Sequence, residues 1–132
     1  MGSPNLIGDI TMNENILIVD DAEFSRTVMR QALLNAGFDN IIEASTADEA
    51  RRIFTQNPPD LTVLDIMLPD CYDLGLLHEF LEIDKDARIV INSAINKPEI
   101  TRAALLTGAR GFISKPFNET DFLCKIRMAL ED

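Results

Sequence analysis

Short, uncharged runs of branched apolar residues recur along the chain, and segments with apolar residues at helical spacing separate them. Runs of this kind, bounded by polar residues, are typical of strands that are buried on both faces of a parallel sheet. The sequence therefore predicts five strands, over residues 16–20, 41–44, 61–64, 88–92 and 111–114.

The segments between these runs predict helices. The first covers about 23–36, where Phe24, Val28, Ala32 and Ala36 form one apolar stripe. The other helices have recognisable starts or apolar faces: a capping box of Thr46 and Glu49 leading to about 56, the apolar residues of 76–81, Pro98 leading to about Gly108, and Asn118 as a cap for the last helix.

Strands that alternate with helices form a parallel sheet with helices on both faces. Because crossovers are right-handed, few topologies remain. We predict an α/β fold with a doubly wound five-stranded parallel sheet of order 2-1-3-4-5, which is flavodoxin-like. In that order the switch point lies between strands one and three, and ligands bind outside the carboxyl ends of those strands.

Three acids and one lysine follow the predicted strands. Asp20 and Asp21 end the first strand, Asp65 follows the third, and Lys115 follows the fifth. The predicted topology brings the three carboxylates to one edge of the sheet, where they repel one another unless positive charge lies among them. A divalent cation and Lys115 would supply that charge. The pattern therefore predicts a site suited to binding and transferring a phosphoryl group.

Each of these residues also has an ordinary structural interpretation. Asp20 and Asp21, or Asp65, could cap a following helix, although capping alone does not explain matching acids on two strands. Lys115 could be a surface lysine, and Ser93 could be an unremarkable serine at the end of a strand.

Composition and charge limit the function classes. The chain has 132 residues, which fits one domain, and its net charge of -10 argues against a basic face that binds nucleic acid. No apolar run is long enough for a membrane span. Cys71 and Cys124 lack the spacing of a zinc site, so reduced thiols in a cytoplasmic protein are expected.

Together these motifs resemble the response-regulator receiver domain of two-component signalling. The resemblance runs from about 15 to 130, on four motifs: the pair Asp20–Asp21, Asp65 with Pro69 four residues later, Ser93–Ala94, and the string GARGFISKPF over 108–117. We therefore expect a receiver domain over 15–132. It follows a leader or cloning-derived segment over 1–14, in which Met12 is an alternative native start.

The resemblance implies a role for each acid. Asp65 would be the phosphoacceptor, taking its phosphoryl group from a histidine kinase or a histidine phosphotransfer protein. Asp21, Asp65 and the Met67 backbone carbonyl would bind Mg²⁺ directly, with Asp20 acting through a water, and Mn²⁺ or Ca²⁺ could take its place. Such a domain is not an enzyme, beyond catalysing its own phosphorylation and dephosphorylation.

The resemblance also implies a switch. Ser93, Ala94 and Lys115 would contact the phosphoryl group, Phe112 would turn inward as Ser93 moves, and the Lys115–Pro116 bond is a candidate cis peptide. The signal would then reach the face built from the fourth helix, fifth strand and fifth helix. That face could support a homodimer, and an output domain could be attached to the chain.

Where the family often has Asp-Gly before the third helix, this chain has Tyr72 and Asp73. Such a glycine usually serves a left-handed backbone, which Asp tolerates better than most residues, so we expect modest strain at Asp73.

Three other functions share this topology. An aspartyl-phosphate phosphohydrolase needs an acid two residues after its nucleophile, where this chain has Met67. A flavin-binding module needs a loop that attracts phosphate, which Asp20 and Asp21 would instead repel. A degenerate receiver could act only as a docking module, although the intact acids and lysine argue against that.

Overall fold

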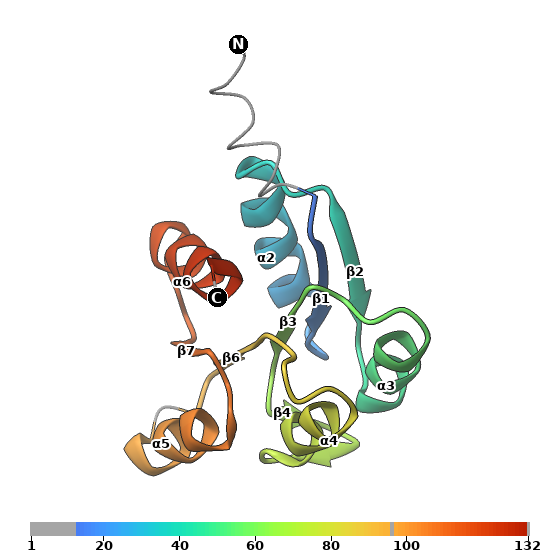
Figure 1. Cartoon of the computed structure of the whole chain (residues 1–132). Helices are drawn as coiled ribbons and strands as arrows, with labels where there is room; N and C mark the ends of the chain where they lie inside the picture. Colours follow the sequence, from blue (N-terminus) through green and yellow to red (C-terminus); the bar gives the residue numbers. More distant parts are fainter. Residues whose placement is uncertain (1–12, 96, 132) are drawn as a thin grey trace.

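The computed structural model describes residues 13–95 and 97–131, and a five-stranded parallel sheet lies at its centre (Figure 1). The strands lie in the order β2-β1-β3-β6-β7, which confirms the predicted order 2-1-3-4-5. Their bounds are β1 (Asn15–Val19), β2 (Asn40–Ala44), β3 (Leu61–Leu64), β6 (Ile89–Ser93) and β7 (Gly111–Ser114). The predicted leader and Met12 lie outside the described residues, except for residues 13 and 14.

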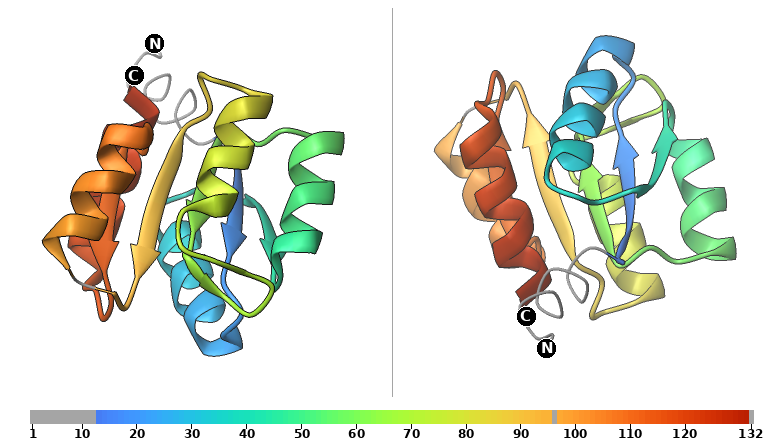
Figure 2. Two further views of the ribbon diagram at one scale, coloured as in Figure 1. Left: turned by 90° about the horizontal axis from the view of Figure 1, so that it is seen from below. Right: turned by 90° about the horizontal axis from the view of Figure 1, so that it is seen from above.

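Within the described residues, five helices cover the two faces of this sheet (Figure 2). On one face lie α2 (Glu23–Asn35) and α6 (Glu119–Glu131), and on the other lie α3 (Ala47–Gln56), α4 (Gly75–Ile83) and α5 (Pro98–Thr107). The predicted starts are confirmed, since Thr46 accepts a hydrogen bond from the Glu49 N–H and Asn118 accepts one from the Asp121 N–H.

The alternation of side chains along each strand divides the core in two. Ile16, Ile18, Val63 and Val90 belong to the cluster beneath α2 and α6. Their neighbours in the sheet face the other cluster, where Phe54 of α3 stacks on Phe80 of α4 with ring centroids 4.1 Å apart. Because both faces of the sheet are buried, most strand residues are apolar, although Thr62 and Asn92 are buried within their strands.

The predicted apolar stripe of α2 is wrong in the first half of the helix. Phe24 is 80% exposed and Val28 is 38% exposed, whereas Met29, Ala32 and Leu33 are buried. A row of residues four apart drifts around a helix with 3.6 residues per turn, so it cannot follow one face for long. The buried face follows mixed spacings of three and four instead.

A two-stranded hairpin between β3 and α4 was not predicted. Its strands β4 (Met67–Leu68) and β5 (Cys71–Tyr72) pair in antiparallel fashion. Asp73 follows with φ of 62°, which confirms the expected left-handed backbone at this position. The hairpin is the part of the chain that departs most from a simple alternation of strands and helices.

Among residues 13–95 and 97–131, no helix is both long and apolar enough to cross a membrane. Cys71 and Cys124 are both free thiols, as the sequence predicts.

Gly108 ends α5 with φ of 134°, and a Cβ at this position would lie 2.9 Å from Cδ1 of Leu81. Because side chains rarely adopt this φ, Gly108→Ala should lower the free energy of unfolding by about 1–3 kcal/mol. Gly111→Ala is the control, since its Cβ would meet Val90 at an ordinary 3.8 Å. Denaturant unfolding of both variants measures the difference, and equal stabilities would contradict the prediction.

Candidate functional site

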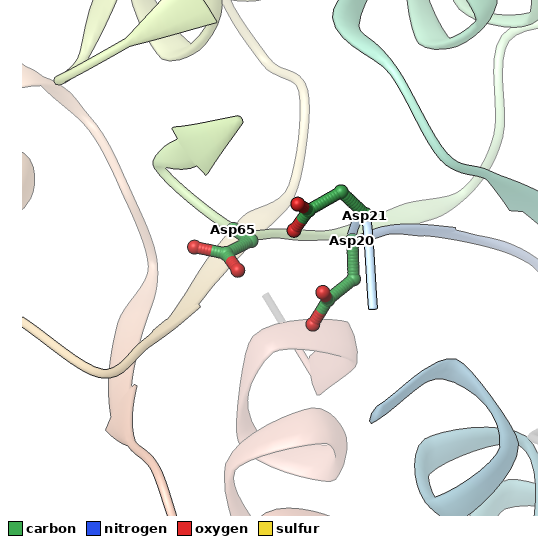
Figure 3. Close-up of side chains that lie close together, drawn as sticks. All are labelled: Asp20, Asp21 and Asp65. Atoms are coloured by element: carbon green, nitrogen blue, oxygen red, sulfur yellow. The ribbon is translucent and has the colours of Figure 1, made fainter. Parts of the chain in front are cut away.

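The topology brings three acids to the carboxyl edge of the sheet. Asp20 follows β1 and Asp65 follows β3, and the last residues of these paired strands, Val19 and Leu64, lie side by side. One carboxylate oxygen from each of Asp20, Asp21 and Asp65 lies within 4.8 Å of the others (Figure 3). Asp20 and Asp65 are 0% and 5% exposed, whereas Asp21 is exposed.

Lys115 reaches these acids from the end of β7, the edge strand of the sheet. It follows β7, and its Nζ donates hydrogen bonds to Oδ2 of Asp20 at 2.6 Å and to Oδ2 of Asp65 at 3.0 Å. Burial of the ammonium lowers the pKa of Lys115, but the hydrogen bonds to Asp20 and Asp65 and the charges of both raise it more. The net pKa therefore lies above its ordinary value. The peptide bond between Lys115 and Pro116 is cis.

Backbone amides hold the remaining oxygens of the two buried acids. The Met67 N–H donates to Oδ1 of Asp65 at 2.9 Å, and the Ala22 N–H donates to Oδ1 of Asp20 at 2.9 Å. Each buried carboxylate is thus fixed by Lys115 through one oxygen and by a main-chain N–H through the other. This arrangement leaves three carboxylates facing one ammonium, an excess of negative charge that favours a further cation.

The ordinary interpretations do not account for this geometry. Ala22 is the N-cap residue of α2 and its own side chain makes no capping bond, and Asp20 accepts from the Ala22 N–H rather than from an N–H within the first turn of the helix. Asp65 lies far from the start of α4, whose N-cap residue is Leu74. Lys115 makes two ion pairs and only 19% of its side chain is exposed, which is unusual for a surface lysine.

Ser93 and Phe112 lie on one face of the sheet. Ser93 is fully buried at the end of β6, and its Oγ accepts a hydrogen bond from the Ile95 N–H at 3.2 Å. Phe112 pairs with Ile91, two residues before Ser93, so both side chains lie on the sheet face that α3, α4 and α5 cover. Phe112 is 8% exposed and therefore lies inward, while the neighbouring Ala94 is exposed.

Arg26 is a contributor to the site that the sequence does not predict. Its Nη1 donates to the Asp20 carbonyl at 2.8 Å, and its Nε pairs with Oε1 of Glu43 at 2.9 Å. Arg30, one turn later, pairs with the same glutamate. Two arginines four residues apart, facing an acid on the next strand, are a signal that could have indicated this tie.

The donor set fits a hard divalent cation. Magnesium prefers oxygen ligands and usually keeps several waters, so a few carboxylates at one edge are sufficient protein ligands. The grouping of Asp20, Asp21 and Asp65 meets that requirement.

Comparisons with known proteins match most of the chain. The family model for the response regulator receiver domain matches residues 16–127. The chemotaxis protein CheY of Bacillus subtilis is 35% identical over 119 residues, which are 90% of this chain and 99% of that protein.

Solved structures match as well. The CheX-CheY-BeF3-Mg²⁺ complex from Borrelia burgdorferi matches with a TM-score of 0.84 and 31% identity, over 89% of this chain and 90% of that one. NtrX from Brucella abortus matches with a TM-score of 0.84 and 30% identity. There the match covers 91% of this chain but only 27% of NtrX.

Removal of the Lys115 charge should destabilise the fold when divalent cations are absent. Lys115→Met leaves Asp20 and Asp65 buried side by side without their counter-charge, so we expect the free energy of unfolding to fall by about 3 kcal/mol. The same change at exposed Lys85 is the control, with an expected effect within about 0.5 kcal/mol.

The pH dependence of that difference follows from the raised pKa of Lys115. A raised pKa contributes stability below the unfolded value of about 10.4 and loses it as the pH rises through the folded value. The difference in the free energy of unfolding between the wild type and Lys115→Met should therefore stay constant from about pH 6 to 9 and become smaller above about pH 10.4. Urea unfolding at a series of pH values measures it, and a difference that grows with rising pH would contradict this assignment.

Proposed function

Because the chain belongs to the response regulator receiver domain family, we propose that it is a signalling domain that accepts a phosphoryl group on Asp65. The observation that carries this proposal is the position of the Asp65 carboxylate. It is almost completely buried, accepts hydrogen bonds from Lys115 and from the Met67 N–H, and lies beside two further acids. A capping or purely structural acid would need no such surroundings.

In the proposed reaction an Asp65 oxygen attacks the phosphorus of a phosphohistidine on the partner. The new P–O bond forms as the P–N bond breaks, and the imidazole leaves with the electrons of that bond. Lys115 then neutralises charge on a phosphoryl oxygen. The donor is a histidine kinase or a histidine phosphotransfer protein.

The Mg²⁺ of the proposed site would be held by Asp20, Asp21, Asp65 and the Met67 carbonyl, with Mn²⁺ or Ca²⁺ as substitutes. When bound, the ion supplies positive charge to the phosphoryl oxygens. Asp20 and Asp65 already point their Oδ2 atoms toward the one ammonium in the site, so they are oriented for a shared cation before any ion arrives.

Ser93 and Phe112 would carry the signal. The Ser93 hydroxyl accepts from the Ile95 N–H and so keeps its own proton to donate to a phosphoryl oxygen, beside Ala94. A shift of Ser93 would change the packing of Phe112 on the same face of the sheet, and with it α5, β7 and α6. A few kcal/mol of new contacts is enough to reverse a two-state population.

The surface of α5, β7 and α6 has properties that suit this output. Leu105, Leu106 and Met128 are 47%, 81% and 60% exposed there. Contiguous exposed apolar side chains favour association, so we propose a homodimer or an attached output domain at this surface.

Asp65 should be the one residue that acetyl phosphate modifies. In Mg²⁺ the intact mass of the wild type should rise by one phosphoryl group, because Asp65 lies in the acidic cluster with Lys115 beside it. Asp20 shares both features but is completely shielded from solvent. Asp65→Asn should remove the gain, whereas Asp86→Asn, an exposed acid outside the site, should keep it. Full modification of the Asp65→Asn variant would point instead to another acceptor, whereas no mass gain in the wild type would point to a docking-only receiver.

The phosphorylated state should be long-lived for its class, because the residues next to the phosphoacceptor cannot hold a water in place for attack. Met67 lies two residues after Asp65, and Ile95 lies two after Ser93. Both are apolar, so neither can align a water for attack on the phosphorus. Met67→Asn should speed loss of the phosphoryl group, as measured by decay in Mg²⁺ without kinase. An unchanged or slower decay would show that water positioning at residue 67 does not limit the reaction.

A further inference from the structure

The hairpin next to Asp65 has one face in the core and one face in solvent. Leu68 and Cys71 are cross-strand partners on the inner face, where Leu68 is fully buried and Cys71 packs against the core. Met67 and Tyr72 are partners on the outer face, where they are 41% and 67% exposed. Two large apolar side chains therefore stand together in solvent directly beside a charged site.

The position of this hairpin is fixed by three ties to the rest of the protein. Its turn residue Asp70 accepts hydrogen bonds from the N–H groups of Ala47 and Asp48 at the start of α3, at 2.9 and 3.1 Å. On the inner face, the Sγ atom of Cys71 lies so near Gly75 that a Cβ there would come within 3.2 Å of it. Leu68 is the third tie, through the core.

The outer face begins at the acceptor itself. The Met67 N–H donates to Oδ1 of Asp65 at 2.9 Å, so the backbone that carries the Met67 side chain touches the carboxylate. Directly opposed residues of an antiparallel pair have Cβ atoms about 4.5–5.5 Å apart, within reach of a tyrosine ring. Methionine has three rotatable side-chain bonds and adapts to its neighbour, whereas tyrosine has few. The ring of Tyr72 is thus the stiffer member of the pair.

We propose that Tyr72 is a positioning residue that holds the Met67 side chain across the water approach to phosphorylated Asp65. This inference rests on the proposed phosphoacceptor function and explains how an exposed, flexible methionine can exclude water. In the hydrolysis that it slows, a water oxygen bonds to phosphorus and the P–O bond to Asp65 breaks. Asp65 keeps the bonding electrons as a carboxylate, and the water proton leaves with the phosphate or to solvent.

Tyr72 could instead promote hydrolysis through its hydroxyl group. If the hydroxyl aligned the attacking water, the phenol oxygen would matter and the ring would not. Tyr72→Phe separates the two roles, because it keeps the ring and removes only the hydroxyl.

The test compares the decay of the phosphoryl group in four variants after acetyl phosphate treatment and removal of the donor. Intact mass in Mg²⁺ buffer gives each rate, and thermal unfolding checks that each variant is folded. We expect Tyr72→Phe to decay like the wild type. Tyr72→Ala should decay about two- to fivefold faster, the range that a cross-strand contact can contribute. In a Met67→Ala background, Tyr72→Ala should add almost nothing.

Three results would overturn the proposal. A rate change in Tyr72→Phe equal to that in Tyr72→Ala would assign the effect to the hydroxyl. Independent effects of the two alanine substitutions would show that Tyr72 does not act through Met67. An unchanged decay rate in Tyr72→Ala would show that Tyr72 does not position Met67. If phosphoryl transfer from a kinase were slower in that variant, Tyr72 would instead be a contact for the partner. Failure of the proposed function is distinguishable, because the wild type would then gain no phosphoryl group.

Discussion

Two carboxylates buried side by side are the constraint on which the rest of this site depends. Asp20 and Asp65 are almost completely shielded from solvent, and like charges at such close range repel strongly in a protein interior. Lys115 offsets part of that repulsion, and backbone N–H groups of Ala22 and Met67 hold the outer oxygens. The positions of β1, β3 and β7 in the sheet are what allow these groups to meet.

The same constraint explains why the site suits a phosphoryl signal. Three acids and one ammonium leave negative charge uncompensated, which favours a divalent cation, and the cation together with Lys115 can then receive a phosphoryl oxygen. In the proposed function, the arriving group redistributes the contacts of Lys115 and engages Ser93. The same proposal has the change reach the surface of α5, β7 and α6 through Phe112, which lies on the same sheet face as Ser93.

Much of this could be predicted from the sequence because strands buried on both faces leave a plain apolar signal. The ends of those runs located Asp20, Asp65 and Lys115, and the strand order brought them together. The orientation of α2 could not be predicted in the same way, because several apolar rows on one helix compete and only packing selects among them. The tie from Arg26 to the Asp20 carbonyl depends on that orientation. The β4–β5 hairpin is too short to be detected from hydrophobic periodicity. Asp73 did indicate a left-handed backbone at the residue that follows the hairpin.

The balance of charge at the sheet edge is tested most directly by the affinity for Mg²⁺ with and without the lysine. The Lys115 ammonium donates hydrogen bonds to oxygens of Asp20 and Asp65, and so it competes with a bound cation. Calorimetric titration of Mg²⁺ into the wild type, Lys115→Met and the control Lys85→Met should therefore give binding at least about tenfold tighter in Lys115→Met alone. A charge about 4 Å away can contribute several kcal/mol at the effective dielectric of a protein surface. Unchanged or weaker binding in Lys115→Met would contradict the central role of that charge balance.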